Sequence, residues 1–376
     1  MMGQTPEQII EGQRQDWNRV AGGWEKWDRF FDEQMAFFNH RLVADARLRF
    51  GMRVLDLGSG TGYPALLGAQ TVGPSGSVIG LDLAEQMLTV ARRKAMALGL
   101  ANVTFRTGDV TALPFEADSF DAVTSRFCLM FLPNIPKAAA EIARVLRPGS
   151  WVAAAVWSAP EKNPSISLSM EAIKKVVELP PPDPTAPGIF RLAKPGDLAG
   201  MLQQAGLVDV TDQEFLAEWS YASAEEYYTS LVEIAAPIQN LMATLSAPQM
   251  QEVKRLIIQA GTQYQRGNRC ETAVASKHDG FKDFVLDQLS ELQGLTCRAM
   301  FGGYGLYCDR VFFGIVQKGR LYFKTNATTT SRYRERGMKP FRPNAKQTLK
   351  NYYEVPVNVL EDAGELTIWA RQAGDL

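Results

Sequence analysis

The sequence is poor in cysteine and histidine, and it lacks a long apolar run. It has four cysteines and two histidines, and no two cysteines have the C-x-x-C spacing that is typical of a structural zinc site. No segment approaches the roughly twenty apolar residues that a membrane span needs. The opening MMGQTPEQIIEG has neither the basic nor the apolar part of a secretory signal. We therefore expect a soluble, cytoplasmic protein that holds no metal.

An excess of charge of one sign is also lacking. The chain has 40 Lys and Arg against 41 Asp and Glu, which argues against a general affinity for polyanions. The charge is unevenly distributed, because the stretch from Lys318 to Lys350 holds ten Lys or Arg and one acid. Its basic and aromatic side chains could bind a nucleic acid or form a solvated surface. No helix-turn-helix or RNP motif accompanies it, so nucleic acid stays an open alternative.

Short apolar runs alternate with amphipathic segments in the first half of the chain. The expected strands are Arg53–Leu57, Ser77–Asp82, Val103–Thr107, Phe120–Ser125 and Trp151–Trp157, and the helices between them are Pro64–Gln70, Ala84–Leu98 and Ile135–Leu146. This alternation predicts an α/β fold, a Rossmann-like parallel sheet with helices on both faces. The helix that begins at Thr5 and the aromatic segment from Trp17 to Phe38 predict an N-terminal lid, and Ala222–Tyr264 predicts a helical cap.

A polar, irregular segment, Arg266–Ser276, marks the expected boundary between two domains. We expect residues 1–272 to form the larger domain with its lid and cap, and residues 277–376 to form a small C-terminal α+β domain. The latter should contain a helix at Phe281–Leu292, strands between Cys297 and Thr325, a basic segment, a strand near Tyr352–Val355 and a last helix near Gly364–Ala373. The polar connector predicts that the two domains are largely independent.

A glycine-rich turn follows the first expected strand in the segment Val54-Leu55-Asp56-Leu57-Gly58-Ser59-Gly60-Thr61-Gly62. Its spacing is G-x-G-x-G, and Tyr63 stands where a dinucleotide fingerprint continues. The carboxylate of Asp56 would repel a pyrophosphate at this strand end. The ligand is therefore expected to be locally cationic, as S-adenosyl-L-methionine is at its amino group and sulfonium.

Two further acids close the next strands. Asp82 ends the second strand, where a carboxylate can accept hydrogen bonds from both ribose hydroxyls. Asp109 follows the third strand and could accept a hydrogen bond from an adenine amino group, with Met87 and Val110 as apolar neighbours of the base. Three acids at successive strand ends, together with the glycines, predict a nucleotide-like cofactor site.

These motifs resemble class I S-adenosylmethionine-dependent methyltransferases, in particular the branch of ubiquinone and menaquinone methylases (methyltransferase type 11). The resemblance rests on VLDLGSGTG, IGLDLAEQML, TGDVTALPF, DSFDAVTSRF and AEIARVLRPGSWV. It implies that Asp56, Gly58 and Gly60 line the methionine end of the cofactor, that Arg126 lies beside it, and that Trp24 covers it. The full set of cofactor-binding residues expected is Trp24, Asp56, Gly58, Ser59, Gly60, Gly62, Asp82, Leu83, Met87, Asp109, Val110 and Arg126.

The C-terminal region resembles the N-terminal domain of the TfoX/Sxy competence-regulator family. The resemblance is carried by MFGGYGLY at 300–307, RLYFK at 320–324 and YYEVP at 352–356. It implies a small α+β fold and brings no enzymatic chemistry with it.

The expected reaction is transfer of a methyl group to a small aromatic or amphipathic acceptor. The fourth strand continues into Ser125-Arg126-Phe127-Cys128 without the Asn-Pro-Pro-Tyr of DNA amino methylases, which argues against a nucleic-acid base. His40 is a weak candidate for a general base, although a lone histidine on an aromatic helix is more often structural. The alternative is a regulator that senses S-adenosylmethionine and whose C-terminal domain binds nucleic acid or a protein partner. The acceptor and the oligomeric state are left open.

Overall fold

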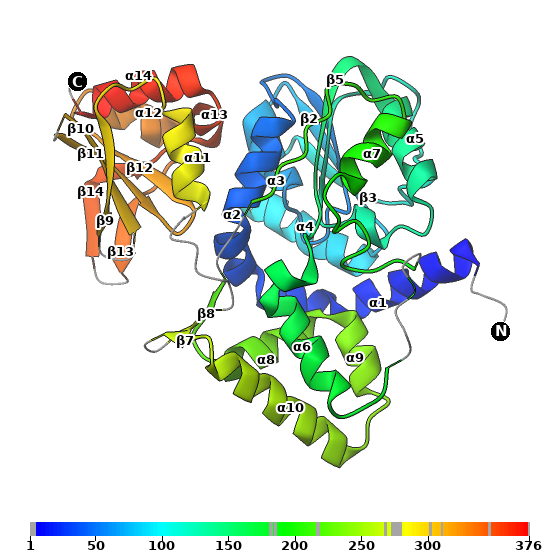
Figure 1. Ribbon diagram of the computed structural model, residues 1–376. Helices are drawn as coiled ribbons and strands as arrows, with labels where there is room; N and C mark the ends of the chain where they lie inside the picture. The colour runs from blue at the N-terminus through cyan, green and yellow to red at the C-terminus, as the bar shows by residue number, and fades with distance from the viewer. Residues whose placement is uncertain are drawn as a thin grey trace.

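The computed structural model of the chain describes residues 5–179, 183, 186–215, 219–266, 269–271, 280–300, 303–309, 311–344 and 347–374. Residues 5–271, the larger part, surround a five-stranded sheet, and residues 280–374, the C-terminal part, contain a six-stranded sheet (Figure 1). Within the described residues, none of the helices is both long enough and apolar enough to cross a membrane.

The sheet of the larger part is parallel and has the order β3-β2-β1-β4-β5. Its strands are β1 (Arg53–Leu57), β2 (Ser77–Asp82), β3 (Val103–Thr107), β4 (Phe120–Arg126) and β5 (Leu146–Ala155). The first four strands lie where the sequence predicts them. The fifth begins earlier than expected because Leu146 already pairs with Phe120, and an irregularity separates this pair from the next one at Trp151.

Helices cover both faces of this sheet, as expected. They are α3 (Ala65–Val72), α4 (Glu85–Ala97), α5 (Ile135–Val145) and α7 (Asp197–Gln204), with the 3-10 turn η1 (Leu129–Phe131) after β4. Successive residues of a strand point to opposite faces. Val54 of β1 accordingly packs with α3 and α4, while Leu55 packs with α5 and α7.

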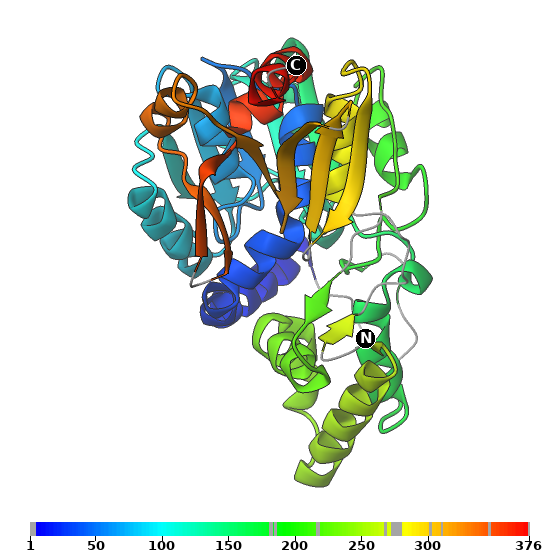
Figure 2. The ribbon, with the colours of Figure 1, turned by 90° about the vertical axis from the view of Figure 1, so that its left-hand side faces the viewer.

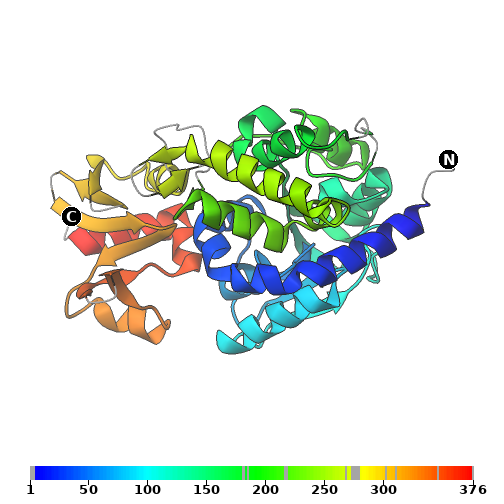
Figure 3. The same ribbon diagram turned by 90° about the horizontal axis from the view of Figure 1, so that it is seen from below.

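An N-terminal pair of helices and a cap complete the larger part. The elements are α1 (Pro6–Lys26), α2 (Asp28–Asp45), η2 (Pro160–Lys162), α6 (Pro164–Lys174), β6 (Ser220–Tyr221), α8 (Ala224–Ile234), α9 (Ala236–Met242), α10 (Ala247–Thr262), β7 (Gln265–Arg266) and β8 (Arg269–Glu271). Thr5 caps α1, as the sequence predicts, and the structure shows in addition a capping box with Gln8. Figure 3 shows α1 lying lengthwise between α4 and the cap helices.

The C-terminal part is the expected α+β fold, with the antiparallel strand order β13-β14-β12-β11-β10-β9. Its elements are α11 (Gly280–Gln288), β9 (Leu295–Met300), β10 (Gly303–Cys308), β11 (Val311–Gln317), β12 (Arg320–Lys324), α12 (Thr330–Glu335), β13 (Pro340–Asn344), β14 (Gln347–Glu354), α13 (Val357–Leu360) and α14 (Ala363–Gly374). The helices pack on one face of the sheet, and Figure 2 shows the other face turned to the viewer.

The two parts are packed together more closely than the polar connector predicts. Phe37 of α2 is buried in the hydrophobic core of the C-terminal part, and Val357 of α13 packs on the core that contains α3. Helix α2 therefore belongs to both cores. The connecting residues 272–279 lie outside the described ranges.

Candidate active site

The order of the parallel strands reverses between β1 and β4, which places a crevice at their carboxyl ends. The glycine-rich loop after β1 lines this crevice, and Gly58, Gly60 and Gly62 have φ values of 68°, 51° and 114°. L-residues rarely adopt such angles. A Cβ built on Gly58 would also overlap the side chain of Cys128, which follows β4. The loop thus requires glycine for its conformation and for its close packing.

Asp56 at the end of β1 holds this loop in place. It is fully buried, and the hydroxyls of Ser59 and Thr124 donate hydrogen bonds of 2.6 and 2.7 Å to its carboxylate. Burial raises the pKa of Asp56 to about 6, against the opposing effect of these two hydroxyls. The carboxylate of Asp56 thus anchors the loop through hydrogen bonds to side chains. The sequence pattern does not predict that Thr124 takes part in this contact.

Asp82 at the end of β2 connects the glycine loop to the next strand. Its carboxylate accepts hydrogen bonds from the backbone N–H groups of Gly60 at 2.8 Å and Ala84 at 2.9 Å. Burial raises its pKa, and these amides oppose the shift. Asp109 after β3 is held by the amide and hydroxyl of Thr111 at 2.8 and 2.7 Å.

Cys128, which follows β4, lies against Gly58 of the glycine loop. Burial raises the pKa of its thiol, and the negative charges of Asp82, Asp56 and Asp109 add to the shift. The end of β4 thus lies beside the loop that follows β1. The apolar neighbours expected for the base, Met87 and Val110, are buried close to this edge, and Leu83 is partly exposed there.

A narrow cleft of about 10 Å³ lies between the glycine loop and the N-terminal helices. We call it the Arg126 cleft; it is lined by Trp24, Asp28, Phe31, Asp32, Thr61, Tyr63 and Arg126. The guanidinium of Arg126 donates to Asn39 of α2 at 2.6 Å. Asp28 forms an ion pair of 2.5 Å with Lys94 of α4. Two carboxylates and two cations therefore stand at the end of the loop where the sequence predicts the methionine end of the cofactor.

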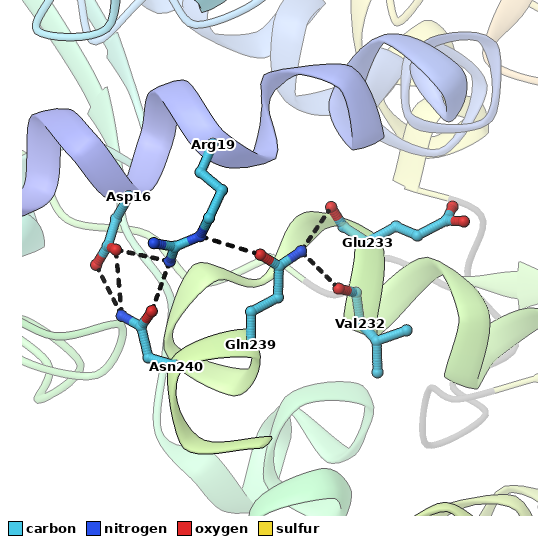
Figure 4. Close-up of polar contacts among 6 residues, drawn as sticks. All are labelled: Asp16, Arg19, Val232, Glu233, Gln239 and Asn240. Atoms are coloured by element: carbon cyan, nitrogen blue, oxygen red, sulfur yellow. Dashed lines mark hydrogen bonds and ion pairs between the residues drawn. The ribbon is translucent and has the colours of Figure 1, made fainter. Parts of the chain in front are cut away.

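The lid helix α1 is fastened to the cap. Arg19 donates to Gln239 at 3.3 Å and to Asn240 at 2.5 Å, and Asn240 also donates to Asp16 (Figure 4). The side chain of Gln239 in turn donates to the backbone carbonyl groups of Val232 and Glu233. This network fixes α1 across the carboxyl edge of the sheet.

Trp24 of α1 has one polar contact with the cap and one ring contact with α2. Its indole N–H donates to the carbonyl of Ile234 at 3.1 Å, and its ring packs on Phe31. Trp24 also lines the Arg126 cleft.

His40, the weak candidate for a general base, is not brought to this crevice. Its Nδ1 lies 3.0 Å from the carboxylate of Glu361, and its ring packs on Phe281, both from the C-terminal part. Burial lowers the pKa of His40 to about 3 and raises that of Glu361. The two side chains form a buried hydrogen-bonded pair between the two parts of the chain.

A larger cavity of about 1180 Å³ lies beside β5 and α2. Phe127 and Trp157 stack in its wall with ring centroids 4.3 Å apart, and Trp219 packs edge-on against Trp157. Trp219 also contacts Phe31 of the Arg126 cleft. A row of aromatic rings therefore connects the cleft with the cavity.

Comparison with known proteins identifies two families along the chain. A family model described as "Methyltransferase domain" matches residues 54–149, and one described as "TfoX N-terminal domain" matches residues 287–375. Nocamycin O-methyltransferase from Saccharothrix syringae is 32% identical over 239 residues, which cover 57% of this chain and 83% of that protein. The chain belongs to the S-adenosylmethionine-dependent methyltransferases.

Other matches are partial. A demethylmenaquinone methyltransferase from Symbiobacterium thermophilum is 40% identical over 130 residues. These residues make up 34% of this chain and 47% of that protein, so the chain spans about half the length of this relative. A solved structure, the SAM-dependent methyltransferase from Aquifex aeolicus, matches with 22% identity and a TM-score of 0.37 over 54% of this chain and 89% of that one. The alternative hypothesis of a regulator finds no support among these matches.

The residues at the crevice suit the cofactor of this methyltransferase family, S-adenosylmethionine. Its ribose hydroxyls and adenine amino group are hydrogen-bond donors, and the carboxylates of Asp82 and Asp109 stand at adjacent strand ends as acceptors. Its methionine end carries an ammonium and a carboxylate, and the Arg126 cleft offers groups of both signs.

Proposed function

We propose that this chain transfers the methyl group of S-adenosylmethionine to a small aromatic or amphipathic acceptor that enters the cavity beside β5. In this proposal Asp82 binds the ribose, Asp109 the adenine amino group, and the glycine loop the methionine end. The observation that carries the proposal is the row of aromatic rings from the Arg126 cleft to the cavity, which begins at the cofactor crevice.

The chemistry requires mainly alignment. A lone pair of the acceptor forms a bond to the methyl carbon while the carbon–sulfur bond breaks and its electrons pass to sulfur, leaving S-adenosylhomocysteine. The sulfonium of the cofactor makes this displacement favourable without a metal. The residues of this chain orient the two partners and exclude water, and Phe127, Trp157 and Trp219 offer flat apolar surfaces for that purpose.

The proposed domain limits are residues 1–272 for the methyltransferase domain and 277–376 for the TfoX-like domain. Strand β8, which ends at Glu271, still pairs with β6 and β7 of the cap. Helix α11, which begins at Gly280, already packs in the core of the C-terminal part.

The direct test is a screen of metabolite extracts with a labelled methyl donor. We expect label to appear in a small organic product with the wild-type protein and to be absent with an Asp82→Ala variant. The proposal is wrong if the folded protein does not bind S-adenosylhomocysteine, or if the label appears only in nucleic acid or protein.

Removing the stacked tryptophan should weaken binding of the acceptor specifically. For Trp157→Ala we expect the acceptor KM to rise about tenfold, because an aromatic contact and its buried area contribute roughly 1–2 kcal/mol. Steady-state kinetics with the acceptor found in the screen would measure this change, and calorimetry should give an unchanged affinity for the cofactor.

Trp151 supplies a matched control, since it lines the same cavity but lies on β5, six residues before Trp157, and stacks on Arg47. It should lie roughly 13 Å before the carboxyl end of β5, because that end, Ala155, is four residues further on and a strand rises about 3.3 Å per residue. Trp151→Ala should change the KM less than twofold. An equal effect of the two substitutions would place the acceptor elsewhere in the cavity.

A further inference from the structure

The hairpin turn between β11 and β12 packs on α2, the helix that carries Asp32 of the Arg126 cleft. Lys318 and Gly319 have φ values of 51° and 68°, the signs required at both central positions of a type I′ turn. A Cβ on Gly319 would overlap the Cβ of Ala36 in α2, so the turn lies directly on that helix. The tight turn and the absence of a side chain at Gly319 therefore allow the start of β12 to pack against α2.

Arg320, the first residue of β12, extends from this turn toward the Arg126 cleft. Its guanidinium lies 2.6 Å from Glu354 of β14 and 3.5 Å from Asp32 of α2. Lys318 on the same turn pairs with Glu33 at 3.7 Å instead. The C-terminal part thus contacts two neighbouring acids of α2, and Asp32 lines the cleft whereas Glu33 does not.

Asp32 differs from the other acid of the cleft in its partners. Asp28 has an ion pair with Lys94 of the methyltransferase domain. For Asp32, the cation within ion-pair distance among the described residues is Arg320. The ion-pair partner of Asp32 is therefore a residue that is nearly 290 positions away in the sequence.

We propose that Arg320 of the TfoX-like domain is a positioning residue of the methyltransferase site: it keeps Asp32 ionised and aligned, so that this carboxylate receives the ammonium of the cofactor's methionine end. The inference rests on the proposed function, because it takes the Arg126 cleft as the place of that ammonium. It gives the C-terminal domain a direct part in cofactor binding.

The electrostatics around Asp32 support this role. Burial raises its pKa and the neighbouring charge of Asp28 raises it further, while Arg320, Lys94 and Arg126 lower it, with Arg320 the strongest of the three. The groups that face it are Arg320 from β12, Lys94 from α4, Asp28 from α2, Arg126 from β4 and the hydroxyl of Tyr63. Loss of Arg320 should raise the pKa of Asp32 and leave a larger fraction of it neutral.

The test measures the affinity for S-adenosylhomocysteine by calorimetry with the full chain. For Arg320→Met we expect affinity to fall about fivefold near pH 7, since a partly solvated charge acts through an intermediate dielectric. Affinity should decline on acidification as Asp32 takes up a proton, and in Arg320→Met this decline should begin at a higher pH than in the wild type. Arg320→Lys should restore most of the affinity, and Lys318→Met, on the same turn, should leave it unchanged.

A double-mutant cycle separates this role from simple domain docking. If Arg320 acts through Asp32, then Arg320→Met should have no further effect in an Asp32→Asn background. The inference is overturned if Arg320→Met binds S-adenosylhomocysteine as tightly as the wild type, or if its effect persists in full without the Asp32 carboxylate. Failure of the wild-type protein to bind S-adenosylhomocysteine would instead overturn the proposed function. Melting temperatures identify any variant that fails to fold.

Discussion

Replacing Asp82 by alanine should weaken binding of S-adenosylmethionine about a hundredfold, because the proposed site would lose two charge-assisted hydrogen bonds to the ribose, each about 1.5 kcal/mol. The substitution also frees the amides of Gly60 and Ala84, which the carboxylate holds at 2.8 and 2.9 Å. The glycine loop then loses its connection to β2. Isothermal calorimetry with S-adenosylmethionine and with S-adenosylhomocysteine would measure the change.

Two variants make this result specific. Asp82→Asn keeps the volume of the side chain but has an amide in place of one oxygen, so it should also bind weakly. Glu116→Ala removes an exposed acid from the same domain and should bind like the wild type. Wild-type affinity in a folded Asp82→Ala protein would show that the ribose does not lie at the end of β2.

Gly58→Ala should abolish measurable cofactor binding. The residue has a φ of 68°, which costs an L-residue roughly 1–2 kcal/mol. Its new methyl group would in addition overlap the side chain of Cys128, so the loop or the segment after β4 has to move into the crevice. Calorimetry should detect no binding, and thermal unfolding should show a lower melting temperature.

The structure provides matched controls that separate the cost of the φ angle from the overlap with Cys128. Gly99 has the same φ of 68° with no atom within 4 Å of its would-be Cβ, so Gly99→Ala should lower the melting temperature while binding stays normal. In the double variant Gly58→Ala with Cys128→Gly the overlap is relieved, and binding should largely return. If the folded double variant still failed to bind, the φ angle of residue 58 alone would account for the loss.

The parallel sheet and the acids at its edge could be predicted from the sequence because their signals are local. Each strand is a short apolar run, and Asp56, Asp82 and Asp109 follow directly at or after the strand ends. Chain order is enough to bring such residues to one edge of a parallel sheet. Strand β13 was not predicted because Pro340 and Pro343 disfavour a strand, and its place at the edge of the sheet explains why prolines are tolerated there.

The docking of the C-terminal part could not be predicted, because it depends on pairs of residues far apart in the sequence. The outward face of α2, with Asp32, Glu33 and Ala36, has the composition of an ordinary helix surface. Only the fold shows that the turn at Gly319 covers it. Within the basic stretch, Arg332 and Arg336 lie over the ring of Trp369 in their own domain, another contact that chain order alone does not reveal.

The contact between α2 and the C-terminal part also has a consequence for synthesis of the protein on the ribosome. His40 and Glu361 are separated by 321 positions, so at 5–20 residues per second α2 emerges on the order of 15–60 s before its partner. During that interval Phe37, which ends buried in the core of the later domain, has nothing to pack against from that side. The nascent methyltransferase domain therefore presents an apolar surface to chaperones until the last quarter of the chain has been translated.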